Sequence, residues 1–152
     1  MTHYEKKWHE LTKISPESYL PIFKFKSDMI LIVARETYVD DTNGLSLYTK
    51  LLFQTLNFNY AFSKEIYDQY KELLSTAIGY DITFEEAQRY ASLARRENKV
   101  FEEFADNVGR MFKKIPEDIK EDIVTICLLL GSINQRPTYK VRSFFARYYK
   151  ED

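Results

Sequence analysis

The chain has 152 residues, with 22 Lys and Arg against 23 Asp and Glu, so its formal net charge is -1. This length and the 45% share of hydrophobic residues predict one domain with a continuous core over residues 1–152. The balanced charge excludes the overall basic character of a dedicated nucleic-acid or anionic-membrane binder, so any such surface must be local.

The composition also indicates a fold class and a compartment. The 12 Tyr and 11 Phe beside only 4 Gly and 4 Pro favour long, well-packed helices over a sheet with many hairpins. A single cysteine, Cys127, cannot form an internal disulfide, and residues 1–7 lack the apolar stretch of a secretory signal. The longest apolar runs, residues 29–34 and 126–130, are far shorter than the ~20 residues of a membrane span. We therefore expect a cytoplasmic protein with no membrane segment.

The first expected helix carries Tyr4, Trp8 and Leu11 on one face and ends near Ser15. Pro16 can then open a short second helix, which a proline at position 21 would limit.

The stretch from 22 to 39 leaves helix and strand as alternatives. Residues 23–26 alternate between apolar and charged side chains like a strand, whereas residues 29–34 form an apolar run that suits either a buried helix or a buried strand. We expect a helix that starts at Ser27, with a small two-stranded element as the alternative.

The next two helices have clear boundaries. Residues 40–44 form a turn sequence, Asp-Asp-Thr-Asn-Gly, that precedes a helix with apolar positions between Leu47 and Leu56. Ser63 can cap the following helix, and Gly79 lies just beyond its last periodic residue, where a C-terminal cap is expected.

Thr83 and Glu86 have the spacing of a capping box, so another helix begins there. Its inward positions then alternate spacings of four and three residues, which is a heptad pattern. These positions are Phe84, Ala87, Ala91, Ala94, Asn98, Phe101, Ala105, Val108, Phe112 and Ile115. We expect one long helix over about 84–114, on the order of 45 Å in length. A break at residues 97–99, near Asn98, is the alternative.

The last third of the chain predicts two more helices. Pro116 opens one that is apolar on nearly all sides from 119 to 130 and that Gly131 closes, so it should be central and buried. Thr138 can cap a terminal helix. The sequence thus predicts an all-α, single-domain bundle of about six or seven helices. Its expected core includes Ile66, Tyr70, Leu73, Leu74, Phe101, Phe104, Ile119, Ile123, Ile126 and Leu130.

Catalytic and cofactor motifs are not recognised in the chain. Its four glycines are too dispersed for a phosphate-binding loop or a dinucleotide fingerprint. The turn at 40–44 cannot be a calcium loop, because the first and twelfth ligand positions would be Val39 and Lys50. The only histidines, His3 and His9, lie near one end of the chain. We therefore expect no cofactor, no metal site and no enzyme. The carboxylate pairs at 85–86, 102–103 and 117–118 should lie in or near the first turn of a helix or on an exposed helix face. Cys127 lies in an apolar run, where burial should raise its pKa and leave it unreactive.

The alanine-rich part of the heptad pattern is the first candidate for a partner surface. Ala87, Ala91 and Ala94 would let another helix approach closely, and Asn98 would place an amide at a core position that can fix register. The alternative, which we favour, is that another helix of the same chain occupies this groove.

The basic, aromatic C-terminal segment is the second candidate. Arg136, Tyr139, Lys140, Arg142 and Arg147 could contact phosphates and stack on bases. The favoured alternative is structural: the cations stabilise a helix C-terminus, and Val141, Phe144, Phe145 and Tyr148 face inward.

From these features we expect a non-enzymatic helical protein that binds a macromolecular partner, as an adaptor, inhibitor or regulator. The partner would be another protein or a second copy of the chain. The alternative is a small nucleic-acid-binding regulator that uses the C-terminal segment.

Overall fold

The computed structural model describes residues 3–56, 62–97, 101–133 and 145. These residues contain seven α-helices, one short 3-10 helix and one two-stranded antiparallel ribbon, which confirms the all-α prediction. The elements are α1 (His3–Leu11), η1 (Pro16–Ser18), α2 (Tyr19–Arg35), β1 (Tyr38–Val39), β2 (Thr42–Asn43), α3 (Gly44–Leu56), α4 (Lys64–Ile78), α5 (Phe84–Glu97), α6 (Phe101–Lys114) and α7 (Glu117–Ile133).

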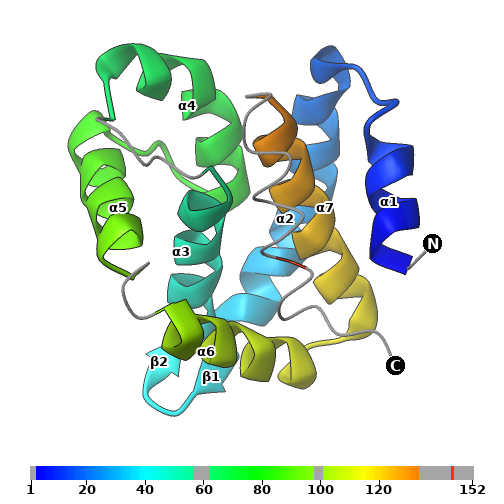
Figure 1. Ribbon diagram of the computed structural model, residues 1–152, viewed down its shortest axis with the longest axis vertical. Coiled ribbons are helices and arrows are strands. Elements are labelled where there is room, and N and C mark those ends of the chain that lie inside the picture. The colour runs from blue at the N-terminus through cyan, green and yellow to red at the C-terminus, as the bar shows by residue number, and fades with distance from the viewer. Residues whose placement is uncertain (1–2, 57–61, 98–100, 134–144, 146–152) are drawn as a thin grey trace.

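Three helices form the centre of the bundle, and the other four surround them (Figure 1). Helices α2, α3 and α7 pack on one another. Helix α1 packs on α7, α4 on α2, and α5 on α3, while α6 crosses the lower end of the bundle beside β1. The centre therefore brings α7 against α2 and α3, which lie far from it in the sequence.

The buried hydrophobic side chains form one contiguous cluster that extends from Trp8 in α1 to Phe145. Every residue of α7 from 123 to 131 is buried, as expected for a helix that is apolar on all sides. Most of the expected core positions are buried, and the remaining three pack against the core with part of their surface exposed. These three are Ile66, Leu73 and Phe101.

The caps predicted for α4 and for the start of α5 are confirmed. The Ser63 hydroxyl accepts a hydrogen bond from the Ile66 amide at 3.2 Å, and Gly79 ends α4 in the left-handed conformation with φ 88°. In the capping box, the Glu86 amide donates to the Thr83 hydroxyl at 3.1 Å, and the Thr83 amide donates to the Glu86 carboxylate at 3.3 Å. These local side chains fix where α4 and α5 begin.

Helix α2 confirms the expected helix for residues 22–35, but its predicted start at Ser27 is wrong, and the end of the stretch 22–39 contains the strand β1 instead. The helix begins at Tyr19, directly after η1, and Pro21 lies in its first turn rather than limiting η1. Amides of a first turn have no partner within the helix, so a proline there removes no hydrogen bond.

Of the turn predicted at 40–44, only residues 40–41 join β1 to β2, while residues 42–43 form β2 itself; Asp40 adopts a positive φ of 55°. Gly44 then starts α3 directly against the end of α2. Its amide donates to the Thr37 carbonyl at 2.7 Å, and a Cβ at this position would lie 2.6 Å from the Ala34 carbonyl oxygen. Only glycine therefore permits this close approach of two backbones.

The single long helix predicted over 84–114 is corrected to two helices, α5 and α6, which run in different directions (Figure 1). A globule of this length is roughly 40 Å across, so a straight helix of about 45 Å could not keep both halves on the core. The division instead lets α5 lie along α3 while α6 packs across α3 and β1. Residues 98–100 lie outside the described part of the chain.

Two predictions concern the end of the chain. Gly131 does not close α7, which continues to Ile133, because a glycine inside a well-packed helix costs only about 1 kcal/mol. The cap at Thr138 lies outside the described residues. Phe145 is described, and it is fully buried, as predicted.

Candidate protein-binding surface

The outer face of α2 carries an exposed row of large apolar side chains. Phe25 is 84% exposed, Met29 52% and Ile32 46%, and they follow one another at spacings of four and three residues. Such spacing places all three on one side of a helix. We call these three residues the α2 stripe. Nothing else in the described part of the chain exposes a hydrophobic side chain as fully as Phe25.

The opposite side of α2 explains why this helix holds its position. Phe23, Ile30, Leu31 and Ala34 are buried there among α3, α4 and α7. A Cβ on Gly79, at the end of α4, would lie 2.7 Å from the Leu31 side chain, so α4 closes directly over this side. Helix α2 thus has two apolar sides, of which the bundle covers one.

Charged residues line one edge of the α2 stripe. Lys24, Asp28 and Arg35 are exposed, and their side chains form no hydrogen bond or ion pair with any residue that the structure describes. On the other edge, the Lys26 ammonium binds the Asp122 carboxylate of α7 at 2.7 Å. One edge of the stripe is therefore joined to α7 by an ion pair, and the charges of the other edge have no partner among the described residues.

The α2 stripe is comparable in extent to the largest apolar patch on a typical monomeric protein. Its three side chains expose roughly 400 Å² of mostly apolar area, within the ~300–600 Å² of the largest patches on monomeric proteins, which are often functional. Such area is left in water at a cost of about 25 cal/mol per Å², which a bound partner would recover.

The alanines predicted as a partner surface lie inside the bundle. Ala87, Ala91 and Ala94 are buried in the core cluster, where α5 packs on α3. The Gln54 side-chain amide donates to the Ala94 carbonyl at 2.9 Å. The small side chains thus serve the close approach of α3, which is the intramolecular alternative, and they are not free to receive a second chain. Asn98 lies outside the described residues.

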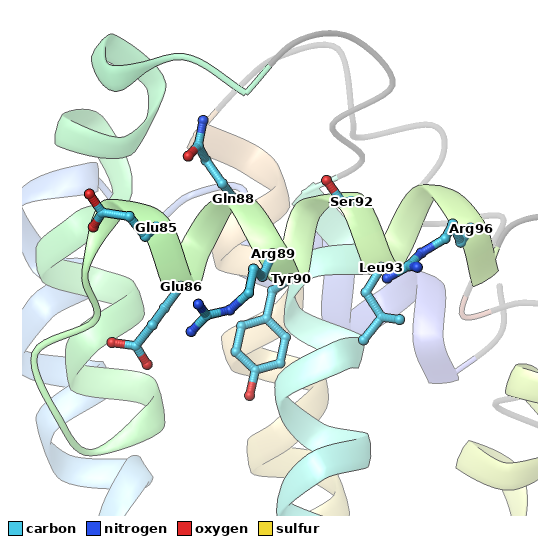
Figure 2. Close-up of a pocket in the computed structure, with 8 residues that line it drawn as sticks. All are labelled: Glu85, Glu86, Gln88, Arg89, Tyr90, Ser92, Leu93 and Arg96. Carbon is cyan, nitrogen blue, oxygen red and sulfur yellow. The ribbon is translucent and has the colours of Figure 1, made fainter.

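The exposed side of α5 borders a shallow hollow of about 790 Å³ (Figure 2). Its described lining comes entirely from α5 and mixes Glu85 and Glu86 with Arg89 and Arg96. The Tyr80 hydroxyl donates to Glu86 at 3.1 Å; burial, with this hydrogen bond and the carboxylate charge, raises the pKa of Tyr80 to about 12. Hydrogen bonds from Thr83 and Tyr80 lower the pKa of Glu86. The mixed charges resemble a solvated helix surface rather than a built binding site.

A second hollow, of about 560 Å³, lies between the β1–β2 turn and α6. Asp40, Glu103 and Asp106 line it, and Arg110 binds Asp40 at 3.0 Å. Among the described residues, no group of three or more His, Cys, Asp or Glu side chains is placed to hold a metal ion. The Arg110 cation instead offsets part of the local negative charge.

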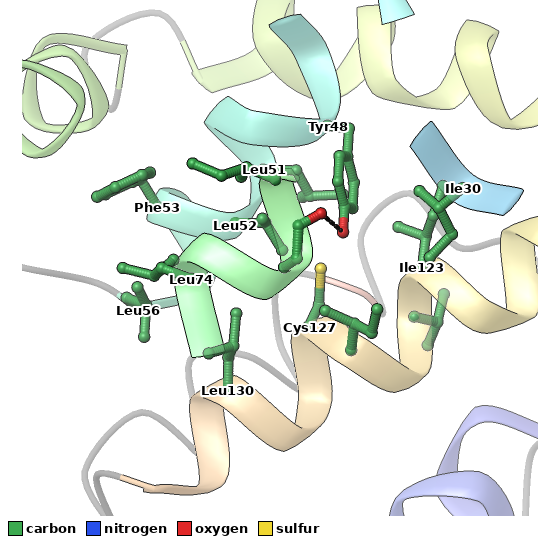
Figure 3. Close-up of a cluster of buried hydrophobic side chains, with 14 of the residues drawn as sticks. Ile30, Tyr48, Leu51, Leu52, Phe53, Leu56, Leu74, Ile123, Cys127 and Leu130 are labelled. Atoms are coloured by element: carbon green, nitrogen blue, oxygen red, sulfur yellow. Dashed lines mark hydrogen bonds between the residues drawn. The ribbon is translucent and has the colours of Figure 1, made fainter. Parts of the chain in front are cut away.

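Cys127 lies deep in the core, below Tyr48, and is fully buried (Figure 3). Burial raises the pKa of the thiol well above its ordinary value, although a hydrogen bond with Thr55 acts in the opposite direction. The prediction that Cys127 is a buried core residue is confirmed. Tyr48 is held over it by donating its hydroxyl to the Ala77 carbonyl at 3.0 Å.

The predicted nucleic-acid contacts lie outside the described residues. This applies to Arg136, Tyr139, Lys140, Arg142 and Arg147, and also to Val141, Phe144 and Tyr148. The sequence interpretation also missed the α2 stripe, because it treated residues 29–34 as one buried run. The spacing of Phe25, Met29 and Ile32 beside a second apolar row could have indicated it.

The comparisons with known proteins return no match: no family model, no curated protein and no solved structure is similar to the chain. Within the described part of the chain, no helix combines the length and the apolar character that crossing a bilayer requires.

Proposed function

We propose that this chain is a non-enzymatic protein that binds a macromolecular partner through the α2 stripe. The observation that carries the proposal is the 84% exposure of Phe25 on a helix whose other apolar side is fully packed. A large ring that lies in water on a well-ordered helix is typical of an interaction surface.

The spacing within the stripe supports the same function. Side chains at i, i+4 and i+7 are the anchors by which one helix packs against a partner helix or enters an apolar groove. Because α2 is held by α3, α4 and α7, its outer face is ordered before binding, so little conformational entropy is lost there.

Site-specific photocrosslinking tests this function. A benzophenone side chain replaces Phe25 in one sample and Lys113, an exposed residue of α6, in the control. We expect Phe25 to give a defined macromolecular adduct in native lysate that Lys113 does not give. Nuclease and protease treatment of the adduct distinguishes nucleic acid from protein.

A second pair of variants shows whether the stripe itself makes the contact. Met29→Glu with Ile32→Glu should abolish the Phe25 adduct and leave the melting temperature nearly unchanged, since both side chains lie on the surface. Equal labelling from Phe25 and Lys113, or an adduct that survives both glutamates, would show that α2 is not the binding surface.

A further inference from the structure

The outer side of α2 has the residue pattern of a two-helix interface. Ile22, Phe25, Met29 and Ile32 follow at spacings of three, four and three residues, which is the seam of a coiled coil. Ile22 is partly buried against the core, and the other three are exposed. A second helix could therefore pack along this seam for about three turns.

The charges of Asp28 and Arg35 indicate which kind of helix can pack along this seam. They are seven residues apart, so they occupy the same heptad position on one edge of the seam. The opposite edge carries Val33 and Lys26, and Lys26 is already bound to Asp122. When two identical helices pack antiparallel, this edge of one helix lies against the same edge of the other. Opposite charges at one heptad position can then form ion pairs between the two chains.

An antiparallel copy of α2 brings these edges together. With Met29 of one chain opposite Ile32 of the other, Asp28 lies within about 3 Å, along the helix axis, of the level of Arg35 in the second copy. The two-fold symmetry repeats this pair, so two ion pairs form. A parallel copy would place Asp28 against Val33, and an antiparallel register centred on Asp28 would bring two carboxylates together.

We propose that the partner of α2 is a second copy of this chain, bound antiparallel along the α2 stripe and oriented by two Asp28–Arg35 ion pairs. This inference rests on the proposed function of the stripe. Two stripes would bury roughly 800 Å² of mostly apolar surface, near the ~1,000 Å² below which specific interfaces are weak or transient. The dimer is therefore weak and reversible, with a dissociation constant on the order of 10 μM.

Charge reversal with sedimentation equilibrium tests the pairing. The wild-type chain should change from monomer to dimer between about 1 and 500 μM. Asp28→Arg alone and Arg35→Asp alone should each weaken self-association about tenfold or more, because each homodimer would then contain two like-charge contacts. Mixing the two variants in equal amounts should restore the dimer, because both contacts again join opposite charges.

Matched controls exclude a general effect of charge. Glu10→Arg and Lys113→Asp make the same charge changes at exposed positions of α1 and α6, and they should leave the wild-type dimer unchanged. Melting temperatures of all variants establish that each chain is folded. A wild-type chain that stays monomeric at about 500 μM, or a mixture that does not restore the dimer, would overturn the inference.

Benzophenone at Phe25 separates this inference from the function on which it rests. An adduct of twice the chain mass supports the second copy as partner. An adduct with a different macromolecule supports the function of the α2 stripe and overturns the dimer. If Phe25 gives no specific adduct and the wild-type chain is also monomeric in sedimentation, both the binding function of the α2 stripe and the dimer are overturned.

Discussion

Helices α2 and α7 both have 17 residues and both pack on α3, yet the bundle covers them differently. Helix α7 lies among α1, α2 and α3, and its residues 123–131 are all buried. Helix α2 packs on α3, α4 and α7 with one side and exposes Phe25 on the other. The apolar content of a helix thus does not tell whether it belongs wholly to the core, because the neighbouring helices decide that.

Two isoleucines give the sharpest test of this comparison. Ile123→Ala in α7 should lower the free energy of unfolding by about 2–5 kcal/mol, because it leaves a cavity in a fully packed region. Ile32→Ala in α2 should change it by only about 0.5 kcal/mol, since that side chain is half exposed. Urea unfolding, at a concentration where the chain is monomeric, measures both. Equal losses would mean that the outer side of α2 is covered.

The dependence of stability on alkaline pH is a second test of the burial of α7. Burial raises the pKa of the Cys127 thiol, so the folded chain keeps a proton that the unfolded chain loses above about pH 8.5. The free energy of unfolding should therefore fall as pH rises from there, by up to about 1.4 kcal/mol per pH unit. Burial also raises the pKa of Tyr48, so Tyr48 should lower the free energy of unfolding in the same way above about pH 10. Cys127→Ala should flatten the profile between about pH 8.5 and 10; an unchanged slope would contradict the assignment.

Gly79 tests how the inner side of α2 is covered. Gly79→Ala should destabilise the fold by about 1–2 kcal/mol, because φ is 88° and the new Cβ would meet Leu31. Gly109→Ala in α6 is the control, since nothing lies within 4 Å of its Cβ position, and it should stabilise by up to about 1 kcal/mol. Thermal unfolding of the two variants should shift in opposite directions.

The smallest effect on stability should come from the ion pair that joins α2 to α7. Lys26 and Asp122 lie 2.7 Å apart, and both side chains are about one quarter exposed. Lys26→Met, Asp122→Asn and the double variant form a double-mutant cycle with an expected coupling of about 0.2–1 kcal/mol. The coupling should decrease at high salt. A coupling that salt does not change would indicate packing rather than charge.

Local signals predicted both ends of α4 and the start of α5. Ser63, Gly79 and the Thr83–Glu86 capping box are each satisfied by contacts within a few residues, so the sequence contains all the information they need. The division of 84–114 into α5 and α6 depends instead on the size of the core, which no local pattern records. The same limit explains the start of α2, where Pro21 stops a helix only if it lies beyond the first turn.

The candidate surface was harder to predict than the fold. The spacing of Ala87, Ala91 and Ala94 is equally compatible with packing on a helix of the same chain and with packing on a second chain. In the structure these alanines are buried in the core of the same chain. The favoured intramolecular role of these alanines is what the structure shows. The error occurred in α2, where the apolar run at 29–34 contains both buried Ile30 and exposed Met29. Exposure is a property of the whole bundle, so periodicity alone could not assign it.

The burial of Phe145 in the same cluster as Trp8 has a consequence for biosynthesis. The two rings are separated by most of the chain, so the core cannot be completed until residue 145 has left the ribosome. Ribosomes add about 5–20 residues per second, and earlier helices emerge with apolar surface that this ring has not yet covered. The nascent chain therefore depends on chaperones or on rapid completion of synthesis more than a domain whose core closes early.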